Sequence, residues 1–139
     1  MQYLDTFFHF EKKNPNKKYI KSFDINDFDL SFVRGLNLED GLATLVEYTA
    51  SIIVDYYIYI QKFMKLINYN PILILCGGGR KNQYLVKRIY SNLKKFISNE
   101  NPKNIIKLID EYNVNGDFVE SQAFAYLAIR SKLGLPISF

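Results

Sequence analysis

The chain has 139 residues, of which 48% are hydrophobic and 23% charged, and its formal net charge is +4 at pH 7. This length and balance predict one folded domain with an ordinary core and argue against wholesale disorder. A single cysteine excludes an intramolecular disulfide, and with a single histidine it argues against a structural zinc site. The mild positive charge does not by itself indicate a nucleic-acid partner.

The first 36 residues are predicted to form an irregular N-terminal segment. It opens with MQYLDTFFHFEKK, whose basic residues follow the apolar stretch, the reverse of a secretory signal. Five lysines then surround Asn14-Pro15-Asn16, which is typical of a solvated loop. Beyond them, Asp27 or Asp29 could cap a short helix.

A long helix is predicted from Asn37, its N-cap, with Glu39 and Asp40 in the first turn, where the helix dipole favours acids. Apolar residues then recur at spacings of three and four, and residues 52–60 are apolar on almost every side. Such a helix lies in a core or awaits a partner. Charged residues interrupt the apolar region 42–67, so we expect no membrane span and a cytoplasmic protein with no membrane partner.

Two strand-and-helix units are predicted to follow. Residues 71–76 are a continuous apolar run, typical of a strand buried on both faces, and Cys76 at its end is expected to be an inert core thiol. The next helix places Leu85, Ile89, Leu93 and Phe96 on one side. Residues 105–109 form a second predicted strand, and 111–116 a loop.

A last helix is predicted to begin at Asp117, which forms a capping box with Glu120, and to end at Gly134. The order helix, strand, helix, strand, helix predicts an α/β lobe over residues 37–139, with helices packed on a short, mainly parallel sheet.

Three consecutive glycines, Gly77-Gly78-Gly79, follow the first strand directly. One interpretation is a tight turn with positive φ; the other is a floor against which a ligand lies, beside the free N–H groups of the next helix. The dinucleotide pattern G-x-G-x-x-G fails because Asn82 stands at its last position, and the phosphate loop G-x-x-x-x-G-K-[ST] is absent. A generic nucleotide or sugar crevice remains.

Three stretches, in order, resemble the anhydro-N-acetylmuramic acid kinases. Residues 74–82, ILCGGGRKN, resemble the family's strand, CGGG and asparagine signature, and residues 38–50 resemble the helix before it. Residues 110–130, DEYNVNGDFVESQAFAYLAIR, resemble its C-terminal segment. The resemblance covers nearly the whole chain, and its implied fold is the C-terminal lobe of an actin-like sugar kinase of the ribonuclease-H-like type.

The resemblance also implies site residues. Gly77, Gly78, Gly79 and Asn82 would border the adenosine end of the nucleotide, and Glu120 would face the sugar, an alternative to its capping role. The complete family enzyme would use ATP and magnesium to phosphorylate 1,6-anhydro-N-acetylmuramic acid in cell-wall recycling.

The departures from the family pattern concern catalysis. The family's Gly-Thr-Ser-x-Asp-Gly phosphate loop and catalytic aspartate have no counterpart here, and only residues 21–26 remain of its Pro-Lys-Ser-Thr-Gly-Arg-Glu segment. We therefore expect no catalytic residue in this chain and no turnover without an N-terminal kinase half acting in trans.

Two hypotheses from other classes stay open: a small nucleotide- or sugar-binding module without chemistry, and a decayed gene product. Among the remaining candidates, His9 has no nucleophile to pair with. Asp110 and Glu111 could act as paired carboxylates, but sequence neighbours at a strand end usually point apart. The tyrosines at 56, 57 and 59 are more typical of packing than of base stacking.

Overall fold

The computed structural model describes residues 28–66, 70–97 and 101–137, and the chain divides into two compact units, residues 1–34 and 35–139. In the first unit a short 3₁₀ helix, η2 (Ser31–Val33), follows Asp29, whose Oδ1 accepts a hydrogen bond from the Ser31 N–H at 2.8 Å. The N-cap position is Leu30, which makes no side-chain cap hydrogen bond, so the prediction that Asp29 caps this helix is wrong. The predictions for the lysine-rich loop, His9 and Asp27 lie outside the described residues.

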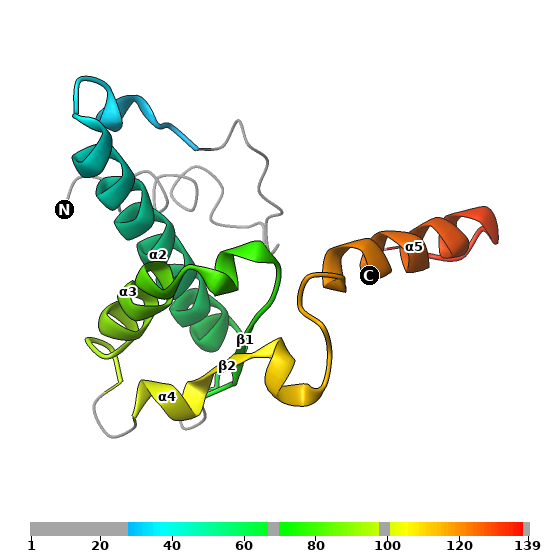
Figure 1. Ribbon diagram of the computed structural model, residues 1–139. Helices are drawn as coiled ribbons and strands as arrows, with labels where there is room; N and C mark the ends of the chain where they lie inside the picture. The colour runs from blue at the N-terminus through cyan, green and yellow to red at the C-terminus, as the bar shows by residue number, and fades with distance from the viewer. Residues whose placement is uncertain (1–27, 67–69, 98–100, 138–139) are drawn as a thin grey trace. The chain divides into compact units, whose positions relative to one another are not determined.

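The second unit follows the predicted order of helix, strand, helix, strand and helix (Figure 1). Its elements are α2 (Leu38–Phe63), β1 (Leu73–Leu75), η3 (Gly78–Lys81), α3 (Gln83–Leu93), α4 (Pro102–Ile105), β2 (Ile106–Leu108), η4 (Ile109–Tyr112) and α5 (Val119–Lys132). The α/β class is therefore confirmed. The four-residue helix α4 and the 3₁₀ turn η4, which flank β2, were not predicted.

The start of α2 is as predicted. The side chain of Asn37 accepts a hydrogen bond from the Asp40 N–H at 2.8 Å, and its amide donates to the Asp40 carboxylate at 2.9 Å. The cap satisfies one of the N–H groups that the first turn leaves without a helical partner. None of the helices in the described ranges has the length and apolarity that a membrane span requires.

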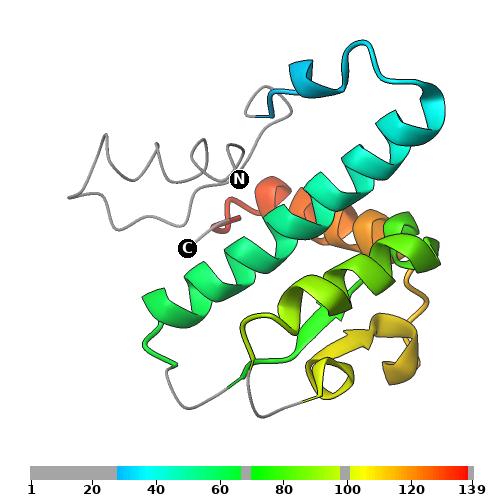
Figure 2. The ribbon, with the colours of Figure 1, turned by 90° about the vertical axis from the view of Figure 1, so that its left-hand side faces the viewer.

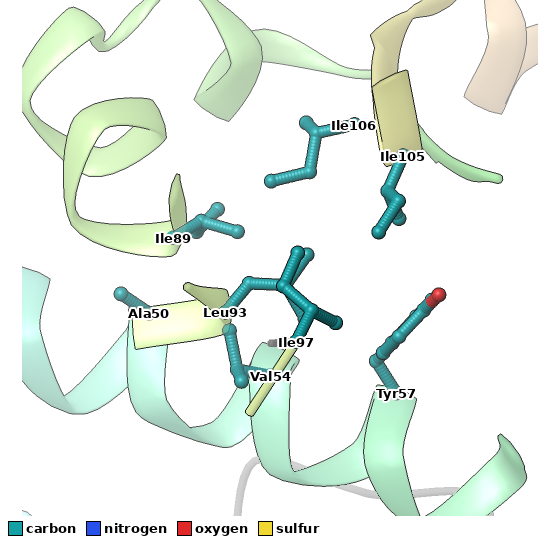
Figure 3. Close-up of a cluster of buried hydrophobic side chains, with 8 residues drawn as sticks. All are labelled: Ala50, Val54, Tyr57, Ile89, Leu93, Ile97, Ile105 and Ile106. Carbon is teal, nitrogen blue, oxygen red and sulfur yellow. The ribbon is translucent and has the colours of Figure 1, made fainter. Parts of the chain in front are cut away.

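The two strands form a parallel pair in which Leu73 is opposite Ile106 and Leu75 is opposite Leu108. The helices α2 and α3 lie side by side (Figure 2) and pack, through a cluster of buried apolar side chains, on one face of this pair. Figure 3 shows the members of that cluster: Ala50, Val54, Tyr57, Ile89, Leu93, Ile97, Ile105 and Ile106. Leu73 and Leu75 pack against it from β1.

Polar contacts also join α2 to α3. The Arg88 guanidinium donates to the Glu47 carboxylate, and the amide of the buried Asn92 donates to the same carboxylate at 3.0 Å. The hydrogen bond from Arg88 is the main reason that the pKa of Glu47 is lowered. Because a buried amide is costly without partners, this network fixes the rotation of α3 against α2.

The prediction that residues 71–76 are buried on both faces is wrong. Successive strand side chains point to opposite faces, and α2 and α3 cover only the face of Leu73 and Leu75. On the other face Ile72 is 50% and Ile74 43% exposed, and Cys76 is exposed. The expectation of a core thiol at Cys76 is therefore wrong as well, because it lies on the uncovered side.

The last predicted helix is present as α5, but its predicted capping box is wrong. Phe118 occupies the N-cap position without a side-chain hydrogen bond, since the Asp117 carboxylate is bound elsewhere. No residue of α5 is buried. The prediction for Phe96 is also wrong: α3 ends at Leu93, and Phe96, in the turn beyond it, is exposed.

Candidate functional site

The glycine turn begins where β1 ends. Gly77 has φ +74°, a left-handed conformation that favours glycine, and its N–H donates to the Gly116 carbonyl at 3.0 Å. A Cβ atom placed on Gly77 or Gly78 would meet no atom within 4 Å. Gly78 and Gly79 are exposed. The turn is therefore open to solvent and is not sealed beneath the protein's own side chains.

Arg80 holds this turn in place, and its side chain is almost fully buried, with 6% of it exposed. Its Nε and Nη2 atoms donate to the two Asp110 carboxylate oxygens at 2.6 and 2.9 Å. Its Nη1 donates to the Gly77 carbonyl at 2.8 Å and to Asp117 Oδ1 at 2.7 Å. We call these residues, Gly77, Arg80, Asp110 and Asp117, the arginine clamp, because they tie the glycine turn to the chain that follows β2.

Gly116 makes the arginine clamp possible by its lack of a side chain. A Cβ atom there would lie 2.3 Å from Arg80 Nε, 2.5 Å from Arg80 Cζ and 2.8 Å from Ile109 Cγ2. The Gly116 N–H also faces Asp110 Oδ1 at 3.4 Å. The backbone thus approaches the guanidinium as closely as only glycine allows.

The carboxylates of the clamp are held in their charged form. The hydrogen bond from Arg80 is the main cause that keeps the pKa of Asp110 well below its usual range. The pKa of Asp117 is lowered by the hydrogen bond from Lys81, at 2.6 Å, and then by that from Arg80. The pKa of Arg80 is raised in turn, mainly by Asp110. Both acids are therefore ion-paired and unsuited to act as general bases at neutral pH.

The expectation that Asp110 and Glu111 point apart is confirmed. Glu111 accepts a hydrogen bond from the Leu108 N–H at 2.8 Å and lies 3.5 Å from the Lys107 ammonium, whereas Asp110 turns to Arg80. Within the described residues no three His, Cys, Asp or Glu side chains come together in a way that could hold a metal ion.

The other predicted site residues lie on either side of the clamp. Asn82 is the N-cap of α3: its Oδ1 accepts a hydrogen bond from the Leu85 N–H at 3.0 Å. Glu120 is exposed in the first turn of α5, three residues beyond Asp117. The structure thus places the three glycines and Asn82 in one turn. The ion pair between Asp117 and Arg80 connects the start of α5, where Glu120 lies, to that turn.

Arg80, Gly116 and Asp117 belong to the site but were not predicted to. A signal for them was present, because Asp110 and Asp117 follow the second strand as Arg80 follows the first. The carboxyl ends of parallel strands meet at one edge of a sheet, so an arginine after one strand can reach acids after its neighbour.

Comparison with known proteins places this arrangement in a family. The family model described as anhydro-N-acetylmuramic acid kinase matches residues 9–139. The kinase of that name from Pelagibacter ubique (strain HTCC1062) is 52% identical over 136 residues, which are 94% of this chain and 32% of that protein. No solved structure matches the chain significantly.

More distant relatives carry the same name. Those from Zymomonas mobilis and Caulobacter vibrioides are 34% and 36% identical, and the match covers 86% of this chain in both. In each it covers 28% of the relative. The chain thus spans about a third or less of the length of these relatives, and it matches their C-terminal part.

Proposed function

Because the chain belongs to the anhydro-N-acetylmuramic acid kinase family, we propose that it forms the C-terminal part of an ATP-dependent kinase acting on that sugar. In this proposal residues 37–139 are one lobe of a two-lobe, actin-like enzyme, and residues 1–36 precede the lobe. The reaction is phosphorylation of 1,6-anhydro-N-acetylmuramic acid in the cytoplasm, as a step of cell-wall recycling.

The observation that carries the proposal is the open glycine turn. Gly77 and Gly78 have free space where a side chain would stand. Arg80 holds the Gly77 carbonyl with one hydrogen bond and makes its other three with the carboxylates of Asp110 and Asp117. A fixed, bare backbone is what a flat nucleoside needs in order to lie closely against a protein. Arg80 thus acts as a positioning residue, since it holds the turn but does not itself face the open space.

Asn82 and Glu120 complete the proposed contacts. Asn82 caps α3 through its oxygen, so the amide is held at the end of the glycine turn, where it would meet the adenosine. Glu120 does not form the predicted capping box. Its carboxylate is therefore available to accept hydrogen bonds from sugar hydroxyls.

ATP would supply the phosphoryl group, and magnesium would neutralise the charge on the phosphates. The acids near the turn are paired with Arg80 and Lys81, so we assign neither magnesium nor the phosphates to them. In the proposal a separate part of the kinase holds the magnesium and the phosphates. That part corresponds to the two thirds of the Pelagibacter ubique kinase that this chain does not match. That part would act as this chain's partner.

A second candidate, a nucleotide- or sugar-binding module without chemistry, is favoured by one feature. Every residue that braces the glycine turn belongs to this chain, from Gly77 to Asp117. The turn could therefore bind a nucleoside without a partner.

The test combines an activity assay with ATP titration. The purified chain alone should give no ATP-dependent phosphorylation of 1,6-anhydro-N-acetylmuramic acid, whereas its complex with the preceding part of the Pelagibacter ubique kinase should. In that complex Gly78→Val should weaken ATP binding measured by calorimetry. Gly41→Ala, a glycine change within α2, should leave binding unchanged. Turnover by the chain alone, or equal ATP affinity in the Gly78→Val complex, would contradict the proposal.

A further inference from the structure

One face of the β1–β2 pair is uncovered. Ile72, Ile74 and Cys76 alternate along the chain and point away from the core, and we call them the open sheet face. Lys107 of β2 is paired with Ile74 in the parallel register and shares this face. Its ammonium lies 3.5 Å from the Glu111 carboxylate.

An open face of this kind is unusual for parallel strands. Parallel sheets are ordinarily covered on both faces, and a sheet of two strands is short of the number that is stable by itself. β1 has three residues, yet the apolar run that contains it extends over residues 71–76. Neither α2 nor α3 reaches the open sheet face, since both pack on the side of Leu73 and Leu75.

No other described element of the second unit takes that place. The last helix, α5, has no buried residue and exposes Phe124, Tyr126 and Ile129. A helix of 14 residues is marginal in water without packing. Both α5 and the open sheet face therefore have apolar surface that the described residues of the second unit leave exposed.

The comparisons indicate what the partner is. The match with the Pelagibacter ubique kinase covers 94% of this chain but only 32% of that kinase. About two thirds of such a kinase therefore has no counterpart in this chain. We propose that the open sheet face is the surface on which this remaining part packs, through an apolar helix or strand laid against Ile72 and Ile74. The proposal rests on the proposed function for the identity of the partner and adds the surface at which it binds.

Cys76 provides a direct measurement, because it is the only cysteine of the chain and is exposed. The partner is the part of the Pelagibacter ubique kinase that precedes the matched stretch, with any cysteines replaced by serine, produced together with the chain. Modification of Cys76 by a thiol reagent is timed for the chain alone, at low and high concentration, and for the complex.

We expect Cys76 to react rapidly in the chain alone at both concentrations and at least tenfold more slowly in the complex. Slow reaction even at high dilution would show that a segment of the chain covers the face. Slowing that depends on the chain's own concentration would show that a second copy does. Either of these two results would overturn the proposal. The proposal would also be overturned if the partner left the rate of Cys76 modification unchanged, or if the two parts failed to co-purify.

A pair of variants locates the contact. Ile74→Glu places a charge on the open sheet face and should abolish co-purification, whereas Phe96→Glu, an equal change at an exposed phenylalanine beyond α3, should not. Circular dichroism confirms that each variant is folded. If both substitutions reduced co-purification equally, the open sheet face would not be the docking surface.

The docking measurement contains neither ATP nor sugar, so it is independent of activity. Failure of Cys76 protection would overturn the docking surface alone. A protected but inactive complex would overturn the proposed function alone.

Discussion

Replacing Gly116 by alanine tests the arginine clamp with a single methyl group. Gly116 is buried and its φ is not positive, so alanine meets no backbone penalty there. The new Cβ would stand 2.3 Å from Arg80 Nε, and ordinary contact begins at 3.4 Å. The guanidinium must therefore withdraw by about 1 Å.

A withdrawal of this size breaks the clamp. The bonds from Arg80 to Asp110 are 2.6 and 2.9 Å long, and lengthening them by about 1 Å takes them beyond hydrogen-bond distance. Overpacking a closely filled site costs about 1–3 kcal/mol. We expect the free energy of unfolding to fall by that amount, and the melting temperature of a domain of this size by about 4 °C per kcal/mol.

The assay is urea denaturation followed by circular dichroism, with Gly78→Ala as the matched control. Gly78 has no atom within 4 Å of the added methyl, so this change should alter stability by less than about 0.5 kcal/mol. In an Arg80→Ala background, Gly116→Ala should cost less, because the main clash is gone. An unchanged denaturation midpoint for Gly116→Ala would refute the reasoning.

Three further predictions concern the core and the ion pairs. Leu93→Ala should lower the free energy of unfolding by about 3 kcal/mol in urea denaturation, whereas Phe96→Ala, at an exposed position, should change it by about 0.5 kcal/mol or less. In the folded protein the pKa values of Asp110 and Asp117 lie below the ordinary 3.8. As the pH falls, the unfolded state therefore binds protons at these groups before the folded state does. The urea denaturation midpoint should thus fall as the pH drops below about 3.8. Asp110→Asn should reduce this acid-dependent loss, and an unchanged profile would contradict the assignment. Arg80→Lys should destabilise the fold in thermal melts, because an ammonium cannot donate side by side to both Asp110 oxygens, and wild-type stability would speak against the clamp.

Local sequence signals predicted α2, β1, α3, β2 and α5, but not α4 or η4. Asn37 with Glu39 and Asp40 marked the start of α2, and the helical spacing of Ile89 and Leu93 marked the buried side of α3. These features depend on residues close together in the chain. Hence they can be read without knowledge of the tertiary structure.

The wrong predictions depended on distant parts of the chain. The apolar run ending in Cys76 indicated a strand covered on both faces, but whether the second face is covered depends on elements that are not adjacent in sequence. Likewise Asp117 and Glu120 fit the pattern of a capping box, and the ion pairs with Arg80 and Lys81 engaged Asp117 instead. In these ion pairs the carboxylate of Asp117 has two cationic partners, whereas an N-cap would give it only backbone N–H donors.

The glycine turn itself was predicted, and its bracing was not. Three glycines after a strand indicated a tight turn with positive φ, which Gly77 adopts at φ +74°. The role of Arg80 required knowing that β1 and β2 are parallel neighbours, which puts the residues after both strands at one edge.

If this chain serves as the C-terminal part of an anhydro-N-acetylmuramic acid kinase, it should be able to replace that part in a related enzyme. A chimera in which its residues replace the matched stretch of the Pelagibacter ubique kinase tests this claim without requiring two separate chains to dock. We predict that the folded chimera transfers phosphate from ATP to 1,6-anhydro-N-acetylmuramic acid and that Gly78→Val raises its KM for ATP. A folded chimera with no phosphotransfer, beside an active Pelagibacter ubique kinase, would contradict the claim.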